Sequence, residues 1–270
     1  MHEFICFNQN YLRAEESSVS AVSSAAFYGR GVFTTIAIRN KKLFLWKKHW
    51  RRLFENAAKL QIDLSEFTEE IVYDSFLKLI EINNFTNGRA RITFFDESSS
   101  KIWNFSTEKR TSFLITTADL YEVKTDLRVG ISPYSVNSTS PLAGVKSCNY
   151  LENVLALEEA KSHGFDEAIR LNERGEIVSA CMANIFWLTG GKLFTPSRTT
   201  GCLNGTTRQF LLEKLDAAES EKGLEVLENA DAIFLTSSGI GVVQIAEFNN
   251  RKFERKFEEI SQCLDSDENE

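Results

Sequence analysis

One lysine stands in a setting that could make its amine nucleophilic. Lys146 lies in the string Ala-Gly-Val-Lys-Ser-Cys-Asn-Tyr over 143–150, where its neighbours are small or apolar and a helix is expected to follow. Burial disfavours the charged form of a lysine, so a buried Lys146 would be shifted toward the neutral amine. A neutral amine can form a Schiff base with an aldehyde, whereas an exposed surface lysine would stay charged.

Three features could bind a phosphate group. The string Thr-Thr-Gly-Cys-Leu-Asn-Gly-Thr-Thr over 199–207 opens into a predicted helix, and the N–H groups at a helix start bind anions. The string Thr-Ser-Ser-Gly-Ile-Gly over 236–241 follows a predicted strand and offers further amides and hydroxyls. Arg52, on a predicted helix after His49, is a fixed cation suited to phosphate. Each loop could also be an ordinary turn with a capping threonine, and Arg52 could lie on a solvated helix face.

The elements that must position these residues begin with a mixture of strands and helices. Apolar alternation predicts strands, and apolar residues three or four apart predict amphipathic helices. In the first half these patterns predict a hairpin over 32–46 with its turn at 40–42, helices over 47–60 and from Thr68 to about 86, and strands over 89–95 and 112–117, with a polar loop over 96–110. The second helix is expected to bury Ile71, Phe76, Leu77 and Ile80.

The second half is richer in strand signals. The patterns predict a strand over 127–134, a loop over 135–144, a helix over 149–163 that ends at Gly164, β-structure over 166–171, 175–188 and 192–196, a helix over 206–222, and β-structure over 232–248. The whole is an α+β protein with a break near 118–124. We therefore expect a smaller N-terminal α/β domain over 1–117 and a larger C-terminal domain over 125–270, and a cleft between domains is a usual place for a cofactor.

Composition excludes several other classes of protein. The 270 residues carry a net charge of −7, so no basic face is available for nucleic acid. The N-terminus has no basic patch followed by an apolar run, and the apolar runs are too short to span a membrane, so we expect a cytoplasmic protein. The five cysteines have no CxxC spacing and are expected to be reduced, and the three scattered histidines predict no metal site.

Three strings carry a resemblance to a known family: GVKSCNYLENVLA over 144–156, DEAIRLNERGEIVSACMANIFWL over 166–188 and CLNGTTRQFLL over 202–212. Together they resemble the two-domain fold-type IV enzymes, which use pyridoxal 5′-phosphate and include branched-chain aminotransferases, D-amino-acid aminotransferases and aminodeoxychorismate lyases. The resemblance extends from Phe27 to Ile245 and makes the C-terminal domain the cofactor-binding one. Because family members are homodimers, it also implies a homodimer here.

The resemblance implies a role for each matching residue. Lys146 matches the Schiff-base lysine, which also moves protons during the reaction. Arg52 matches the phosphate-binding arginine of an HxxRL pattern. The remaining cofactor contacts are expected at Thr206, Thr207 and Ser238 for the phosphate and at Tyr150 for the phenolic oxygen, a position that varies within the family.

One position departs from the family pattern. Counting back from Phe186 places Ser179 where a glutamate usually pairs with the pyridine nitrogen, and Glu176 is out of register by three residues. A carboxylate would keep that nitrogen protonated and make the ring a strong electron sink, whereas a serine hydroxyl cannot enforce the charge. Ser179 therefore argues against transamination and leaves elimination open.

The stretch Phe-Tyr-Gly-Arg-Gly-Val-Phe-Thr-Thr over 27–35 most resembles aminodeoxychorismate lyases. There the second threonine, matched by Thr35, lies in the active site, although a Thr-Thr pair also suits a plain strand. The resemblance implies conversion of 4-amino-4-deoxychorismate to 4-aminobenzoate and pyruvate, a step of folate biosynthesis. Tyr28, Arg30 and Arg91 are candidate substrate-binding residues, the two arginines by their charge.

Two other functions remain open at this point. The first is an aminotransferase of branched-chain or D-amino acids, which Tyr28 favours and Ser179 opposes. The second is a non-catalytic relative that binds a ligand or a partner, as the missing glutamate suggests. Retention of Lys146, Arg52 and both phosphate loops opposes this second alternative.

Overall fold

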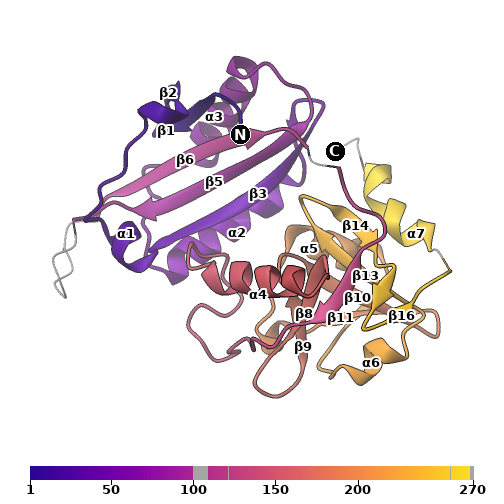
Figure 1. The fold of residues 1–270 in the computed structure, drawn as a ribbon. Helices are drawn as coiled ribbons and strands as arrows, with labels where there is room; N and C mark the ends of the chain where they lie inside the picture. The colour runs from indigo at the N-terminus through magenta and orange to yellow at the C-terminus, as the bar shows by residue number, and fades with distance from the viewer. Residues whose placement is uncertain (100–108, 121, 256, 268–270) are drawn as a thin grey trace. The chain divides into compact units, whose positions relative to one another are not determined.

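The chain folds into two compact units. In a computed structural model, residues 1–99, 109–120, 122–255 and 257–267 are described (Figure 1). Unit 1 comprises residues 1–121 and 145–149, and unit 2 comprises residues 122–144 and 150–270. Residues 145–149 thus belong to unit 1, whereas the predicted boundary assigned them to the C-terminal domain. Backbone pairing explains this, because Phe33 N donates to Lys146 O at 3.0 Å and Cys148 N donates to Gly31 O at 2.8 Å.

Unit 1 contains a six-stranded antiparallel sheet in the order β2-β1-β6-β5-β3-β4. Its strands are β1 (Phe4–Phe7), β2 (Asn10–Arg13), β3 (Gly31–Arg39), β4 (Lys42–Leu43), β5 (Gly88–Asp96) and β6 (Thr111–Ala118). The predicted hairpin is confirmed as β3 and β4, with Asn40 and Lys41 at positive φ in the turn, as a two-residue hairpin requires. The β1–β2 hairpin has no counterpart among the predicted elements.

Helices cover one face of this sheet (Figure 1). They are α2 (Trp46–Lys59) and α3 (Glu69–Ile82), and unit 1 also contains the short helix α1 (Ser24–Tyr28) and the 3-10 helix η1 (Ala14–Glu16). The Thr68 side chain caps α3 by accepting from Ile71 N at 3.2 Å. The buried face of α3 is Val72, Ser75, Phe76, Leu79 and Ile80. The prediction of Ile71 and Leu77 on that face was wrong, because the inward stripe begins at Val72 and repeats four and seven residues later.

Unit 2 contains two five-stranded sheets, in the orders β12-β11-β10-β13-β14 and β16-β15-β7-β8-β9. The first consists of β10 (Asn184–Thr189), β11 (Lys192–Pro196), β12 (Ala217–Ser220), β13 (Ala232–Ser237) and β14 (Gly241–Gln244). The second consists of β7 (Arg128–Ile131), β8 (Glu167–Leu171), β9 (Ile177–Ala180), β15 (Glu247–Phe248) and β16 (Arg251–Lys252). The apolar run predicted as one β segment over 175–188 divides between the two sheets, because Ala180 N donates to Ala183 O and closes a turn.

The helices of unit 2 are α4 (Leu151–Ser162), α5 (Thr206–Lys214), α6 (Glu225–Glu228) and α7 (Glu258–Ser261), with the 3-10 helices η2 (Arg198–Thr200) and η3 (Gln262–Asp267). The helix predicted over 149–163 is confirmed as α4, and Gly164 follows it with φ +80°. The helix predicted over 206–222 is wrong beyond Lys214. Leu215 is extended, and the chain continues as β12, which pairs in parallel with β11.

All five cysteines are free thiols, and Cys6, Cys181 and Cys202 are buried. Within the described ranges, no helix combines the length and the apolar character needed to cross a bilayer. The loop predicted over 96–110 lies partly outside the described residues.

Candidate functional site

Lys146 lies beside the first residues of β3 in unit 1. Its neighbour Ser147 bridges to Val32, and its own side chain is partly buried with Nζ 4.5 Å from the centroid of the Phe33 ring. Burial, followed by the positive charges of Arg52 and Arg91, lowers the pKa of Lys146 to about 7. The amine is therefore divided between its neutral and protonated forms near neutral pH, which suits both nucleophilic attack and proton transfer.

The inward face of β3 holds a buried polar cluster. Thr34 is fully buried, and its Oγ1 accepts a hydrogen bond from Arg52 Nη2 at 2.5 Å. The same oxygen lies 2.7 Å from His49 Nδ1, and both partners project from α2. Burial, then the charges of Arg52 and Lys146, hold the pKa of His49 well below its usual range, so the imidazole is neutral. Thr34 thereby fixes the guanidinium of a buried arginine, the cation expected to bind phosphate.

The opposite face of β3 carries Phe33 and Thr35, because side chains alternate along a strand. Thr35 and Arg91 of β5 are directly opposed Cα partners and therefore share this face. The Arg91 guanidinium lies 3.7 Å from the centroid of the Phe33 ring, and its Nε donates to Thr93 Oγ1 at 3.1 Å. Phe33 thus brings Lys146 and Arg91 to one aromatic ring.

The two other candidate substrate-binding residues lie near the end of α1 and the start of β3. Arg30 donates from Nε and Nη2 to the carbonyl oxygen of Leu60 at 3.1 and 3.0 Å, and its Nη1 lies 3.7 Å from Asp96. Its guanidinium is therefore held at the C-terminal end of α2 by protein groups. Tyr28 is the last residue of α1 and is partly buried.

Unit 2 contains a hydroxyl-lined helix start. α5 begins at Thr206 after Gly205, where any β-carbon would clash with Asn184 Oδ1. Thr206 Oγ1 lies 3.1 Å from Ser238 Oγ, so the loops that contain them approach each other. Within the described part of the chain, the buried hydroxyl oxygens of Thr207 and Thr236 have no hydrogen-bond partner. Buried polar atoms require a partner, so these two hydroxyls together with a helix N-terminus fit a phosphate group.

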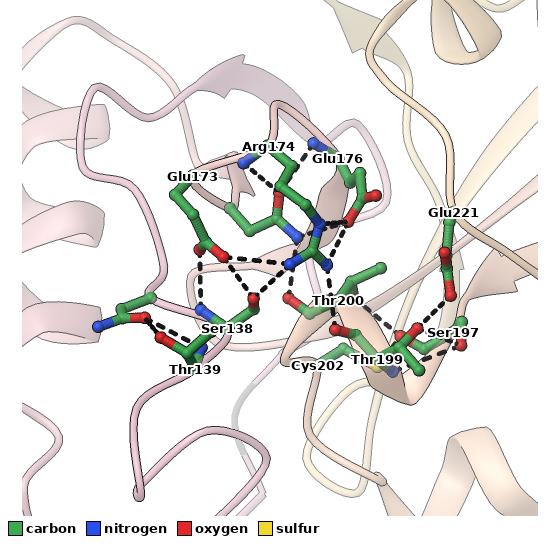
Figure 2. Close-up of polar contacts among 12 residues, drawn as sticks. Ser138, Thr139, Glu173, Arg174, Glu176, Ser197, Thr199, Thr200, Cys202 and Glu221 are labelled. Carbon is green, nitrogen blue, oxygen red and sulfur yellow. Dashed lines mark hydrogen bonds and ion pairs between the residues drawn. The ribbon is translucent and has the colours of Figure 1, made fainter.

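Ser179 lies in β9, opposite Arg170 of β8, and is partly buried. The nearest acid in sequence, Glu176, is held in the turn between these strands (Figure 2). Its Oε2 accepts from Arg174 Nη2 and from Asn172 Nδ2, both at 2.7 Å. In an extended strand, residues three positions apart project from opposite faces. Glu176 therefore does not take the place of the glutamate expected at position 179.

The roles of Thr34 and Phe33 in these clusters were not predicted from the sequence, and His49 was treated only as part of a pattern. Thr236 belongs to the loop over 236–241 that was predicted to bind phosphate. The signal for Thr34 was available, since a threonine at an inward position of an otherwise apolar strand needs a buried partner. The partner itself could not be read from the sequence. Tyr150, another predicted cofactor contact, is the residue that precedes α4 as its N-cap.

The chain is similar to known proteins over most of its length. A family model described as amino-transferase class IV matches residues 31–248. Aminodeoxychorismate lyase from Bacillus subtilis (strain 168) is 27% identical over 269 residues, which cover 96% of this chain and 92% of that protein. D-alanine aminotransferase from Staphylococcus haemolyticus is 27% identical over 256 residues, with 92% and 90% covered. The crystal structure of branched-chain aminotransferase from Thermoproteus uzoniensis has a TM-score of 0.91 at 23% identity, with 98% and 94% covered, a likeness of fold.

Proposed function

Because this chain belongs to the amino-transferase class IV family, we propose that Lys146 is the lysine that binds its cofactor. Enzymes of this family depend on pyridoxal phosphate. The family, the α+β fold of type IV and the cofactor predicted from the motifs are therefore confirmed. The amine of Lys146 carries the proposal, since its pKa of about 7 suits both attack on an aldehyde and proton transfer.

The remaining contacts to the cofactor are assigned by their chemistry. When bound, pyridoxal phosphate supplies an aldehyde for Lys146 and a ring that withdraws electrons from a substrate amine. In this proposal Arg52, already oriented by Thr34, neutralises the phosphate. The other contacts are Thr206, Thr207 and Ser238 at the phosphate, Tyr150 at the phenolic oxygen and Ser179 at the pyridine nitrogen.

We further propose that the reaction is the conversion of 4-amino-4-deoxychorismate to 4-aminobenzoate and pyruvate. Lys146 removes the proton from the ring carbon that bears the amino group, and the C–O bond to the enolpyruvyl group breaks. The departing enolate takes up a proton to become pyruvate, while the ring becomes aromatic. Ser179, in place of a carboxylate, supports this elimination over transamination. Arg91 is the proposed carboxylate contact and Thr35 the proposed active-site hydroxyl, whereas Arg30 is already held by Leu60.

An aminotransferase of D-amino or branched-chain amino acids is the second candidate. The relative that supports it, a D-alanine aminotransferase, has the same 27% identity as the lyase relative. The two candidates differ in what happens to the cofactor, because an amino donor converts it to the pyridoxamine form only in transamination.

The test is release of pyruvate and 4-aminobenzoate by cofactor-loaded protein, with Lys146→Ala as the control. Both products are expected in equal amounts, and the variant is expected to lose them together with the covalently bound cofactor. Well-loaded protein that makes neither product would contradict the lyase, and conversion to the pyridoxamine form by D-alanine or leucine would establish the transferase. Failure to take up the cofactor at all would support a non-catalytic role.

The substrate in either case is a small molecule. We also propose that the enzyme is a cytoplasmic homodimer, as the family resemblance implies. Sedimentation equilibrium of the loaded protein would measure the mass, and a monomer at micromolar concentration would contradict the dimer.

A further inference from the structure

A buried arginine lies next to the residue that we assign to the cofactor nitrogen. In unit 2, Arg170 of β8 and Ser179 of β9 are directly opposed Cα partners in an antiparallel pair. Opposed residues project from the same face of the sheet, with Cβ atoms about 5 Å apart. Arg170 is therefore the cross-strand neighbour of the Ser179 hydroxyl.

This face of β8 and β9 is the one that α4 covers. Two residues away along each strand, small side chains pack beneath the helix in one buried cluster of Ala156, Ala160, Ala168 and Cys181. The Arg170 guanidinium reaches the first turn of the same helix, where its Nη2 lies 3.4 Å from Glu152 Oε2. Ser179 and Arg170 thus lie toward the end of α4 that begins next to Tyr150, the proposed contact of the phenolic oxygen.

The charge of Arg170 is only weakly compensated. The arginine side chain is 3% exposed, whereas that of Glu152 is 76% exposed, so water screens the acid more than the cation. The other hydrogen bond goes to a neutral group, because Arg170 Nε donates to the carbonyl oxygen of Tyr134 at 3.3 Å. A buried positive charge therefore lies on the face of the sheet that also carries Ser179.

The other titratable groups nearby do not reverse this sign. Burial, followed by the charge of Glu167, raises the pKa of the Cys181 thiol to about 12, so the thiol is neutral. Glu167 itself projects from the opposite face of β8, one residue from Ala168. Its carboxyl group accepts from the backbone N–H groups of Cys181 and Met182 at 2.9 and 3.0 Å, and burial raises its pKa to about 7.

We propose that Arg170 and Ser179 together keep the pyridine nitrogen of bound pyridoxal phosphate unprotonated, so that this enzyme works with a neutral cofactor ring. The inference rests on the proposed function, because it takes Ser179 as the residue at that nitrogen. The Ser179 hydroxyl can donate to an unprotonated nitrogen, and the Arg170 charge disfavours a second positive charge beside it. A neutral ring withdraws electrons weakly, which suits an elimination driven by aromatisation of the product.

The experiment is ¹⁵N NMR of the protein loaded with pyridoxal phosphate labelled at the ring nitrogen, recorded as a function of pH. The chemical shift separates protonated from unprotonated pyridine whether or not the enzyme turns over. In the wild-type protein the nitrogen is expected to be unprotonated at pH 7. A protonated nitrogen at pH 7 in loaded protein would overturn the inference, whereas absence of any bound signal would instead refute the proposed function.

Four variants separate the contributions. Ser179→Glu is expected to protonate the nitrogen at pH 7, and Arg170→Met is expected to raise the titration midpoint by about one unit or more. Arg170→Lys keeps the charge and should leave the midpoint low, which tests the inference even if the methionine variant folds poorly. Arg128→Met is the matched control. Arg128 lies on β7, the strand next to β8, and also pairs with a glutamate, Glu247, at 3.3 Å, but its side chain is exposed. Equal midpoints for the Arg170→Met and Arg128→Met variants would overturn the role of Arg170.

Discussion

The ammonium nitrogen of Lys146 lies 4.5 Å from the centroid of the Phe33 ring, and the Arg91 guanidinium lies over the same ring at 3.7 Å. The face of an aromatic ring attracts both cations. Burial, followed by the positive charges of Arg52 and then Arg91, acts against protonation of the amine and lowers the pKa of Lys146 to about 7. This balance predicts a measurable dependence of stability on pH.

The free energy of unfolding of the cofactor-free protein should rise between pH 7 and pH 10.5. The folded pKa of Lys146 is about 7 and its ordinary value is 10.5, so between these values the unfolded chain binds more protons. Stability therefore rises with pH across this window. Lys146→Met removes this slope and should be more stable than wild type at pH 7, because methionine has no charge to bury. The expected gain is about 1–4 kcal/mol, less than the full pKa shift would give, since solvent screens a partly buried side chain.

Urea unfolding at several pH values measures this slope. Lys78→Met is the matched control, because Lys78 also lies over an aromatic ring, at 4.7 Å from Tyr11, but is exposed. Parallel slopes for wild type and Lys146→Met would contradict the lowered pKa.

Thr34→Val should weaken cofactor binding by acting on Arg52. The valine is similar in shape but removes the hydroxyl that binds both Arg52 and His49. Hydrogen bonds to charged groups contribute about 1.5–3 kcal/mol, so we expect a loss of stability of that order and a roughly tenfold or larger increase in the Kd for pyridoxal phosphate. Thr93→Val is the control, since Thr93 accepts from Arg91 instead, and it should leave this Kd unchanged.

The hydroxyls of Thr207 and Thr236, which have no hydrogen-bond partner among the residues that the structure describes, predict opposite effects on stability and on binding. A buried polar group without a partner costs about 1–3 kcal/mol, so Thr207→Val and Thr236→Val should leave the cofactor-free protein as stable as wild type or more so. If these hydroxyls donate to phosphate, the Kd for pyridoxal phosphate should rise about tenfold.

Thr195→Val provides the comparison for these two variants. Its hydroxyl is also buried but donates to the carbonyl oxygen of Ile185 at 2.8 Å, so this variant should lose about 1–2 kcal/mol without a change in cofactor affinity. Thermal unfolding with and without cofactor measures both quantities. A loss of stability in Thr207→Val equal to that in Thr195→Val would show that the hydroxyl has a partner within the protein.

Local sequence patterns were sufficient to predict most of the helices and strands and the setting of Lys146. The α2 helix, the β3–β4 hairpin and α4 all follow from periodicity and turn residues that lie within a few positions of each other. The setting of Lys146 between small and apolar residues also indicated burial. In each case the determining interactions are close in sequence.

Where the predicted elements differ from the structure, the contacts that determine the structure join residues that are distant in sequence. The stretch after Lys214 is helical by composition, but β12 forms because its backbone pairs in parallel with β11, about 24 residues earlier. The hydrogen bonds from the Arg30 guanidinium to the carbonyl oxygen of Leu60, which is 30 residues away in sequence, could likewise not be predicted from local patterns. A single sequence contains no direct record of such pairings.

Arg174 and Glu173 join three loops of unit 2 (Figure 2). Arg174 Nη1 donates to Ser138 Oγ at 2.8 Å, and its Nη2 donates to the carbonyl oxygen of Thr199 at 3.2 Å. Glu173 accepts from the backbone N–H of Ser138 at 2.9 Å and from its hydroxyl at 2.5 Å. These bonds to Ser138, more than the charge of Arg174, lower the pKa of Glu173 to about 2.

Glu173 should therefore stabilise the fold at neutral pH and cease to do so in acid. Its folded pKa of about 2 lies below its ordinary value of 4.5, so between these values the unfolded chain binds more protons. The stabilisation is complete above pH 4.5 and is lost as the pH falls toward 2. Glu173→Gln should be less stable than wild type at pH 6, with a difference that shrinks toward pH 3 in urea unfolding. The exposed Glu254→Gln should show no such convergence, and a difference that is constant with pH would mean that Glu173 acts through its shape and not its charge.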